Sequence, residues 1–192
     1  MAKKESTLIN MLVALIMVTL VASTALGFVY KVTKEPIAAA KLAKKLDAIQ
    51  KVVPPFDNDP NAEEYKMPMD GDTLRFYPAK SNGELVGTAV ETFTNQGFTG
   101  EIKVMVGITP DGIINDVAVL EHKETPGLGD KMERKKSDWS TQFQNKDPKD
   151  FKMAVKKDGG DVDAITASTI SSRAFCDAVN RAYNAYLEGG KK

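Results

Sequence analysis

The chain has 192 residues, and its 26 basic and 26 acidic side chains give a formal net charge of zero. A balanced chain lacks the basic surface that binding to a polyanion requires, which argues against nucleic acid as a partner. Cys176 is the only cysteine, so a disulfide within the chain and a cysteine-based metal site are both excluded. Because Cys176 falls in the last predicted helix, we expect a small buried thiol.

The first predicted element is a membrane span over residues 8–30, which carry no charged side chain. As a helix this segment would be roughly 34 Å long, enough to cross the hydrocarbon core of a bilayer. A cleaved signal peptide, with Lys3 and Lys4 before the apolar segment, is the competing interpretation. The span is favoured because the apolar segment is longer than usual in a signal peptide and the helical pattern continues beyond it.

The lysines around the span give an indication of orientation. Lys3 and Lys4 precede it, but a larger group follows it, namely Lys31, Lys34, Lys41, Lys44 and Lys45. A simple count under the positive-inside rule would therefore place the rest of the chain in the cytoplasm.

After the span, apolar residues at helical spacing predict a helix over residues 37–53, with Pro36 in its first turn and Pro54-Pro55 at its end. The polar residues 57–72, which include two prolines, are typical of a surface connection.

Two hairpins follow. The turn sequences Ser81-Asn82-Gly83 and Pro110-Asp111-Gly112 each separate two strand-like segments. The predicted strands are residues 73–77, 84–93, 101–109 and 113–121. Apolar residues alternate along the third of these, so one face of the sheet should be buried. A short helical tendency follows over residues 130–143, and residues 151–155 suggest one more short strand.

A final amphipathic helix is predicted from the segment 163–172 to about Glu188, and Gly189-Gly190 should end it. Strands grouped in the middle and helices at the two ends predict an α+β fold. We expect one N-terminal transmembrane helix followed by a single domain whose antiparallel sheet is flanked by helices.

No complete enzymatic constellation is present. His122 is the only histidine, so a multi-histidine metal site is impossible, and its position at a strand end favours a structural or surface role. The chain has no Gly-x-Ser-x-Gly elbow, Gly-x-Gly-x-x-Gly motif or Walker loop. A secreted hydrolase is therefore not supported.

Three segments could form a ligand site. The loop 124–129, Glu-Thr-Pro-Gly-Leu-Gly, could approach a ligand closely, and the glycines of the turn 95–100 could leave room for a flat ring. The third segment is the hydroxyl-rich start of the last helix, where free backbone N–H groups and the helix dipole favour a phosphate. Asp163, Thr166 or Thr169 could equally be an ordinary N-cap there, and residue chemistry alone does not choose one hydroxyl over another.

These motifs resemble those of the FMN-binding subunits of the ion-pumping Rnf and Na⁺-translocating NADH:quinone oxidoreductase complexes. By its length the chain is most similar to the G subunit of Rnf. The loop 124–129 matches that family's Glu-Thr-Pro-Gly-Leu-Gly sequence without a change, and the turn Gly97-Phe98-x-Gly100 is also typical of it. The flavinylation motif of the family is Asp-x-x-Ser/Thr-Gly-Ala-Thr. Asp163, Thr166 and Thr169 match its polar positions, while Ala167 and Ser168 replace Gly-Ala.

The resemblance implies FMN joined covalently to Thr169 by a phosphoester. On this hypothesis we expect Glu124, Thr125 and Leu128 to line the ring and Ser168 or Ser171 to lie near the phosphate. Thr166 is also expected among the cofactor-binding residues. A cofactor would carry the redox chemistry, while the protein supplies attachment, orientation and electrostatics. The absence of a catalytic dyad is consistent with such a relay.

The implied function is an electron-transfer subunit of a membrane-bound, ion-translocating ferredoxin:NAD⁺ oxidoreductase. The implied partners are the other membrane subunits, a flavin transferase and membrane lipid. The implied location is the bacterial inner membrane, with the domain on the periplasmic side, against the lysine count. Residues 1–7 would be a tail, 8–30 the span, 31–56 a connecting helix and 57–192 the extracytoplasmic FMN-binding domain.

The alternative function belongs to another class. The chain could be a membrane-anchored, non-redox binding or assembly module that uses the same glycine loops. In that case the protein has lost the flavin because Ala167-Ser168 replaces the Gly-Ala of the motif.

Overall fold

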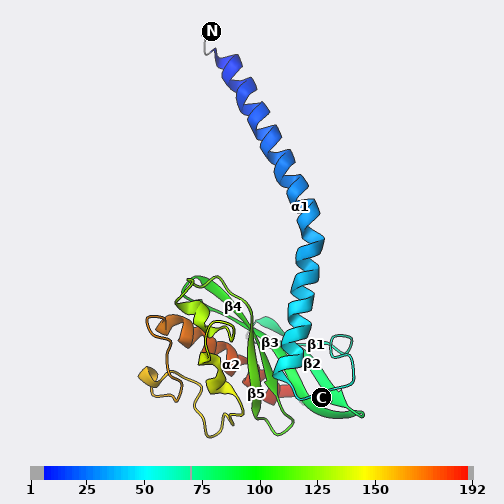
Figure 1. Cartoon of the computed structure of the whole chain (residues 1–192), viewed down its shortest axis with the longest axis vertical. Helices are drawn as coiled ribbons and strands as arrows, with labels where there is room; N and C mark the ends of the chain where they lie inside the picture. The colour runs from blue at the N-terminus through cyan, green and yellow to red at the C-terminus, as the bar shows by residue number, and fades with distance from the viewer. Residues whose placement is uncertain (1–6, 70, 190–192) are drawn as a thin grey trace. The chain divides into compact units, whose positions relative to one another are not determined.

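The computed structural model describes residues 7–69 and 71–189, which divide into two units between Ala43 and Lys44. Figure 1 shows the long helix α1 and a domain built from strands and shorter helices. Residues 1–6 of the expected tail and Gly190 of the expected Gly-Gly stop lie outside the described residues.

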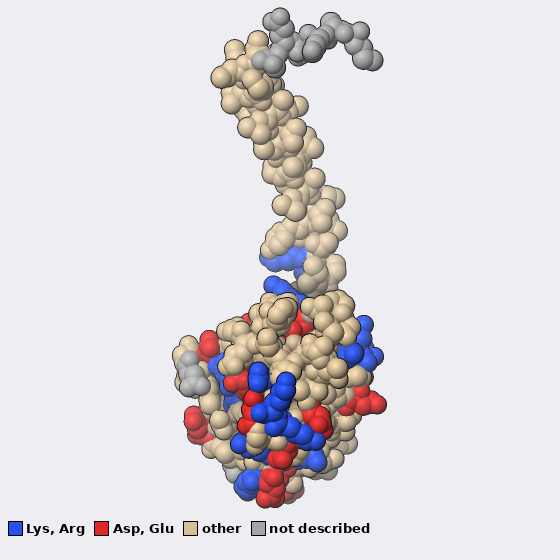
Figure 2. All heavy atoms as spheres, turned by 90° about the vertical axis from the view of Figure 1, so that its left-hand side faces the viewer, with Lys and Arg blue, Asp and Glu red and all other residues tan. Residues whose placement is uncertain are grey.

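Helix α1 covers Leu8–Val52 without a break, where the sequence suggested a span and a separate helix. Pro36 lies inside this helix. A single proline removes one backbone hydrogen bond, and the alanine-, lysine- and leucine-rich residues that follow it are strong helix formers. Among the described residues α1 is the one helix long and apolar enough to cross a membrane, and no residue of its most apolar segment is buried. Figure 2 shows no charged side chain along the described N-terminal part of this helix.

The domain contains a five-stranded sheet in the order β1-β2-β3-β4-β5, and every neighbouring pair is antiparallel. The strands are β1 (Tyr65–Met69), β2 (Asp72–Ser81), β3 (Glu84–Gly97), β4 (Gly100–Ile108) and β5 (Ile114–Glu121). Both predicted hairpins are confirmed. Their turns place Asn82, Gly83 and Gly112 at positive φ, as such turn sequences require.

Two predictions for short segments were wrong. Strand β1 lies within residues 57–72, which we expected to be only a connection; because β1 is an edge strand, it tolerates Pro68 without losing a bond inside the sheet. Residues 151–155 do not form a strand. Val155 makes only an isolated bridge to Val162, although its side chain is buried as a strand residue's would be.

The helical tendency over residues 130–143 takes the form of two 3₁₀ helices, η1 (Gly129–Met132) and η2 (Trp139–Phe143). A third, η3 (Lys156–Asp158), precedes the last helix, α2 (Thr169–Gly189). The single tryptophan, Trp139, packs edge-on against Phe143 and Phe175, which ties η2 to α2.

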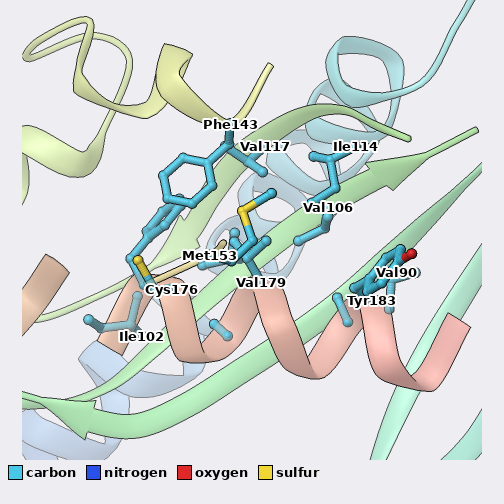
Figure 3. Close-up of a cluster of buried hydrophobic side chains, with 14 of the residues drawn as sticks. Val90, Ile102, Val106, Ile114, Val117, Phe143, Met153, Cys176, Val179 and Tyr183 are labelled. Atoms are coloured by element: carbon cyan, nitrogen blue, oxygen red, sulfur yellow. The ribbon is translucent and has the colours of Figure 1, made fainter. Parts of the chain in front are cut away.

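Both faces of the sheet are covered within the domain. On one face α2 packs over a large apolar core, to which β4 contributes every second residue: Ile102, Val104, Val106 and Ile108. Figure 3 shows this core around Val179 of α2, with Phe143 of η2 and Met153 of the segment before η3 packed into it. On the other face the last residues of α1 form a second cluster with strands β2 to β4. Val52 approaches so closely that a Cβ on Gly107 would lie 1.8 Å from its carbonyl oxygen.

The expected α+β architecture is therefore confirmed. The domain holds the start of α2, the loop 124–129 and the β3–β4 turn on one stable framework.

Candidate functional site

The segment before α2 is anchored to η2. The Asp163 backbone N–H donates to Gln142 Oε1 over 2.7 Å, and its carbonyl oxygen accepts from the Trp139 indole N–H. The Asp163 side chain points elsewhere and pairs with Lys156 at 2.8 Å, where both groups are exposed. Asp163 therefore lies before the helix as an anchoring residue and is not its N-cap.

A tight turn then leads into the helix. Ala167 has a φ of 60°, a left-handed conformation that is costly for a residue with a Cβ. The Ser168 N–H donates to the Ile165 carbonyl over 2.9 Å, and Ser172 Oγ bonds both the Ile165 N–H and the Ser168 carbonyl. These hydrogen bonds hold the turn so that α2 begins at Thr169. They thereby fix the position at which the Thr169 side chain leaves the backbone.

A buried chain of hydroxyl groups joins the start of α2 to the loop 124–129. Ser171 Oγ donates to Glu124 Oε2 over 2.5 Å, and Ser168 Oγ lies 2.8 Å from Ser171 Oγ. A hydroxyl has one proton, and that of Ser171 is used on Glu124, so Ser168 is the donor to Ser171. The other oxygen of Glu124 accepts from the Thr99 N–H and hydroxyl, both over 3.0 Å.

The glycines of the two loops close around Glu124. A Cβ on Gly97 would lie 2.9 Å from Glu124 Oε1, and one on Gly129 would lie 2.7 Å from Glu124 Cβ and 2.8 Å from Ser171 Oγ. The sequence suggested that glycines in these loops could make room for a ligand. At Gly97 and Gly129 they allow the backbone to pack against a buried carboxylate.

Burial alone would raise the pKa of Glu124, but the hydrogen bonds from Ser171 and Thr99 outweigh it. The pKa of this carboxyl therefore lies below its ordinary value, and Glu124 is ionised at neutral pH.

These elements enclose a pocket of about 360 Å³. It is lined by Phe98, Glu124, Thr125, Leu128, Gly129 and the first residues of α2, 167–171. Three of its apolar side chains are unusually exposed: Phe98 by 67%, Leu128 by 40% and Ile170 by 48%. The pocket thus combines an apolar rim, a buried anion and the start of a helix.

The structure brings together six of the seven residues that the sequence singled out. Glu124, Thr125, Leu128, Ser168, Thr169 and Ser171 all line the pocket. Thr166 is exposed and does not line it. Phe98 was noticed only as part of a turn motif. Ile170 was missed, because an apolar residue at a helix start looks like an ordinary core position.

His122 has a structural position next to the site. Its Nδ1 accepts the Glu124 backbone N–H over 3.0 Å, and its Nε2 lies 3.1 Å from Glu133 Oε1. Cys176 is buried in α2, as predicted, and burial raises the pKa of its thiol to about 12. Within the described residues no group of histidine, cysteine, aspartate and glutamate side chains is arranged to hold a metal ion.

The class of the domain follows from its similarity to a known domain family. Residues 97–184 match the model of the FMN-binding domain family, and this range contains the loop 124–129, residues 97–100 of the turn and most of α2. The domain is thus an FMN-binding domain.

Similar full-length proteins define the family. The G subunit of the ion-translocating oxidoreductase complex of Erwinia tasmaniensis is 40% identical over 166 residues, which cover 82% of this chain and 79% of the relative. Its namesake in Aliivibrio fischeri is 37% identical over 191 residues, covering 93% and 88%. One in Shewanella oneidensis is 46% identical over 114 residues, covering 58% and 54%. The chain belongs to this family of G subunits, and with helix α1 it is a single-pass membrane protein.

The residues of the pocket fit FMN. The exposed faces of Phe98, Leu128 and Ile170 would be covered by a flat aromatic ring system, a favourable burial of apolar surface. The first turn of α2 offers backbone N–H groups that have no partner within the helix, which suits a phosphate.

Proposed function

We propose that this chain is the electron-transfer subunit of an Rnf-type, ion-translocating ferredoxin:NAD⁺ oxidoreductase and that it carries FMN joined by a phosphoester to Thr169. The observation that carries the proposal is the position of Thr169. It is the first residue of α2, it lines the pocket, and its side chain is only partly buried.

The neighbouring hydroxyl groups support the choice of Thr169. Those of Ser168, Ser171 and Ser172 are buried and already bonded within the protein. Thr166 is exposed but lies outside the pocket lining. Among the described residues the Thr169 hydroxyl has no hydrogen-bond partner, so at the start of α2 it is the hydroxyl that both lines the pocket and is free to be esterified.

The ester would join the Thr169 hydroxyl oxygen to the phosphorus of FMN, with the net loss of one water, made up of the hydroxyl proton and one hydroxyl group of the phosphate. One negative charge would remain on the phosphodiester, next to the N–H groups of the first turn of α2. When bound, FMN supplies the redox chemistry. The protein residues hold the phosphate at the helix start, cover the ring with apolar side chains and place one carboxylate beside it.

The relatives are named as subunits of an ion-translocating oxidoreductase complex, and on that basis we infer that the partners are the other membrane subunits. A flavin transferase would attach the cofactor, and α1 would contact lipid. We place the domain on the periplasmic side. The lysines that suggested the opposite orientation belong to the uninterrupted helix α1, not to a flexible loop, and Lys45 is engaged with Glu91 and Tyr77 in the domain.

Co-expression with a flavin transferase tests the attachment. After denaturing electrophoresis, wild type and Thr166→Ala should fluoresce under ultraviolet light, whereas Thr169→Ala should not. Thr166→Ala is the matched control because it removes a nearby exposed hydroxyl. Fluorescence retained by Thr169→Ala would refute the assignment. A wild-type protein with the mass of the bare chain would instead favour the non-redox module.

A further inference from the structure

Glu124 is the only charged side chain that lines the pocket among the described residues. It is 5% exposed, and its two carboxylate oxygens accept hydrogen bonds from Ser171 and Thr99. All of these donors are neutral groups. They stabilise an ionised carboxylate without cancelling its charge.

Glu124 forms no ion pair within residues 7–69 and 71–189, and the attraction to His122 is the smallest of the effects that lower the pKa of this carboxyl. His122 contacts the backbone of Glu124: its Nδ1 accepts the Glu124 N–H, while its Nε2 faces Glu133. The carboxylate is therefore a fixed negative charge in the pocket wall, and the groups that donate hydrogen bonds to it are the hydroxyls of Ser171 and Thr99 and the Thr99 N–H.

We propose that Glu124 lowers the reduction potential of the flavin by holding a negative charge beside its ring. This inference rests on the proposed binding of FMN in the pocket. Reduction adds two electrons and one or two protons to the ring, so the ring becomes more electron-rich and, when only one proton is taken up, more negative. A nearby anion in a poorly solvated wall opposes that change more strongly than it would in water. The role of Glu124 is thus to make the bound flavin a stronger electron donor.

Two variants separate the charge of Glu124 from its hydrogen bonds. Glu124→Gln removes the charge while keeping an oxygen that can accept from Ser171 or Thr99. Ser171→Ala removes one donor and keeps the charge, which becomes less stabilised. Both variants disturb the same contact between Ser171 and Glu124, but the proposal requires the two to shift the potential in opposite directions.

The measurement is a spectroelectrochemical titration of the full-length protein in detergent, after flavin attachment by a transferase. In Glu124→Gln the potential should rise by at least the equivalent of a tenfold change in the reduction equilibrium, about 30 mV for a two-electron couple. In Ser171→Ala it should fall. Glu124→Asp keeps the charge and should stay closer to wild type than Glu124→Gln.

An unchanged or lower potential in Glu124→Gln would overturn the proposal, as would a rise in Ser171→Ala. If Glu124→Gln carries too little flavin to titrate, the direction of the shift in Ser171→Ala decides. Failure of the proposed function would be recognised separately, since the wild-type protein would then lack the mass of attached FMN before any titration.

Discussion

Replacing Ala167 with glycine should stabilise the domain. Ala167 has a φ of 60°, and its side chain is exposed, so the methyl group adds strain without filling space in the core. The left-handed conformation costs a residue with a Cβ roughly 1–2 kcal/mol, whereas glycine adopts it freely. Glycine also makes the unfolded chain more flexible, which favours unfolding and offsets part of the gain in stability.

The net effect of Ala167→Gly should be about 1 kcal/mol of added stability, which for a chain of this length corresponds to a rise in Tm of roughly 2–4 °C. Differential scanning fluorimetry or circular dichroism of the full-length protein in detergent would measure it. Ala164→Gly is the matched control. Ala164 lies in the same segment, its φ is not positive, and it packs against the main core, so its replacement should lower Tm. A Tm for Ala167→Gly at or below that of wild type would refute the reasoning.

Two further predictions concern the surroundings of Glu124. Gly129→Ala would place a Cβ 2.7 Å from Glu124 Cβ and 2.8 Å from Ser171 Oγ. It should therefore cost about 1–3 kcal/mol in urea unfolding and reduce covalent flavin fluorescence; a fully stable and fully flavinylated variant would contradict the packing described. The second concerns pH. Since the pKa of Glu124 is lowered by folding, its stabilising contribution is complete above the ordinary glutamate pKa of about 4.3 and is lost as the pH falls through the lower folded-state value. Urea unfolding between pH 7 and pH 3 should therefore show a smaller loss of stability in Glu124→Gln than in wild type, and equal losses would argue against an ionised Glu124.

The sequence predicted those parts of the fold whose signals are local. Asn82-Gly83 and Asp111-Gly112 marked both hairpin turns, because few residues other than glycine and asparagine adopt positive φ. The edge strand β1 was missed because Pro68 and its polar neighbours are typical of a loop, and only pairing with β2 makes the segment a strand. The prediction of a strand over residues 151–155 was wrong because this segment has the apolar residues of a strand but does not pair with one. Met153 and Val155 are buried by tertiary packing without joining the sheet.

For the site, the sequence identified both the loop 124–129 and the hydroxyl-rich helix start, but it could not show that they meet. The contact between Ser171 and Glu124 joins residues 47 positions apart, and no local pattern encodes such a contact. Nor could the sequence separate the hydroxyls of Ser168 and Thr169, which are adjacent and chemically alike. Both line the pocket, but the structure separates them by burial: Ser168 is buried and bonded inside the protein, while Thr169 is only partly buried.

The attachment of FMN at Thr169 is tested most directly by mass spectrometry of the native protein. Trypsin should release residues 158–173 as one peptide, bounded by Lys157 and Arg173, and this peptide contains every candidate hydroxyl. Our account predicts that the peptide carries the mass of FMN minus water, and that fragmentation places this mass on Thr169. An unmodified peptide, or a flavin located on Thr166 or Ser168, would contradict it.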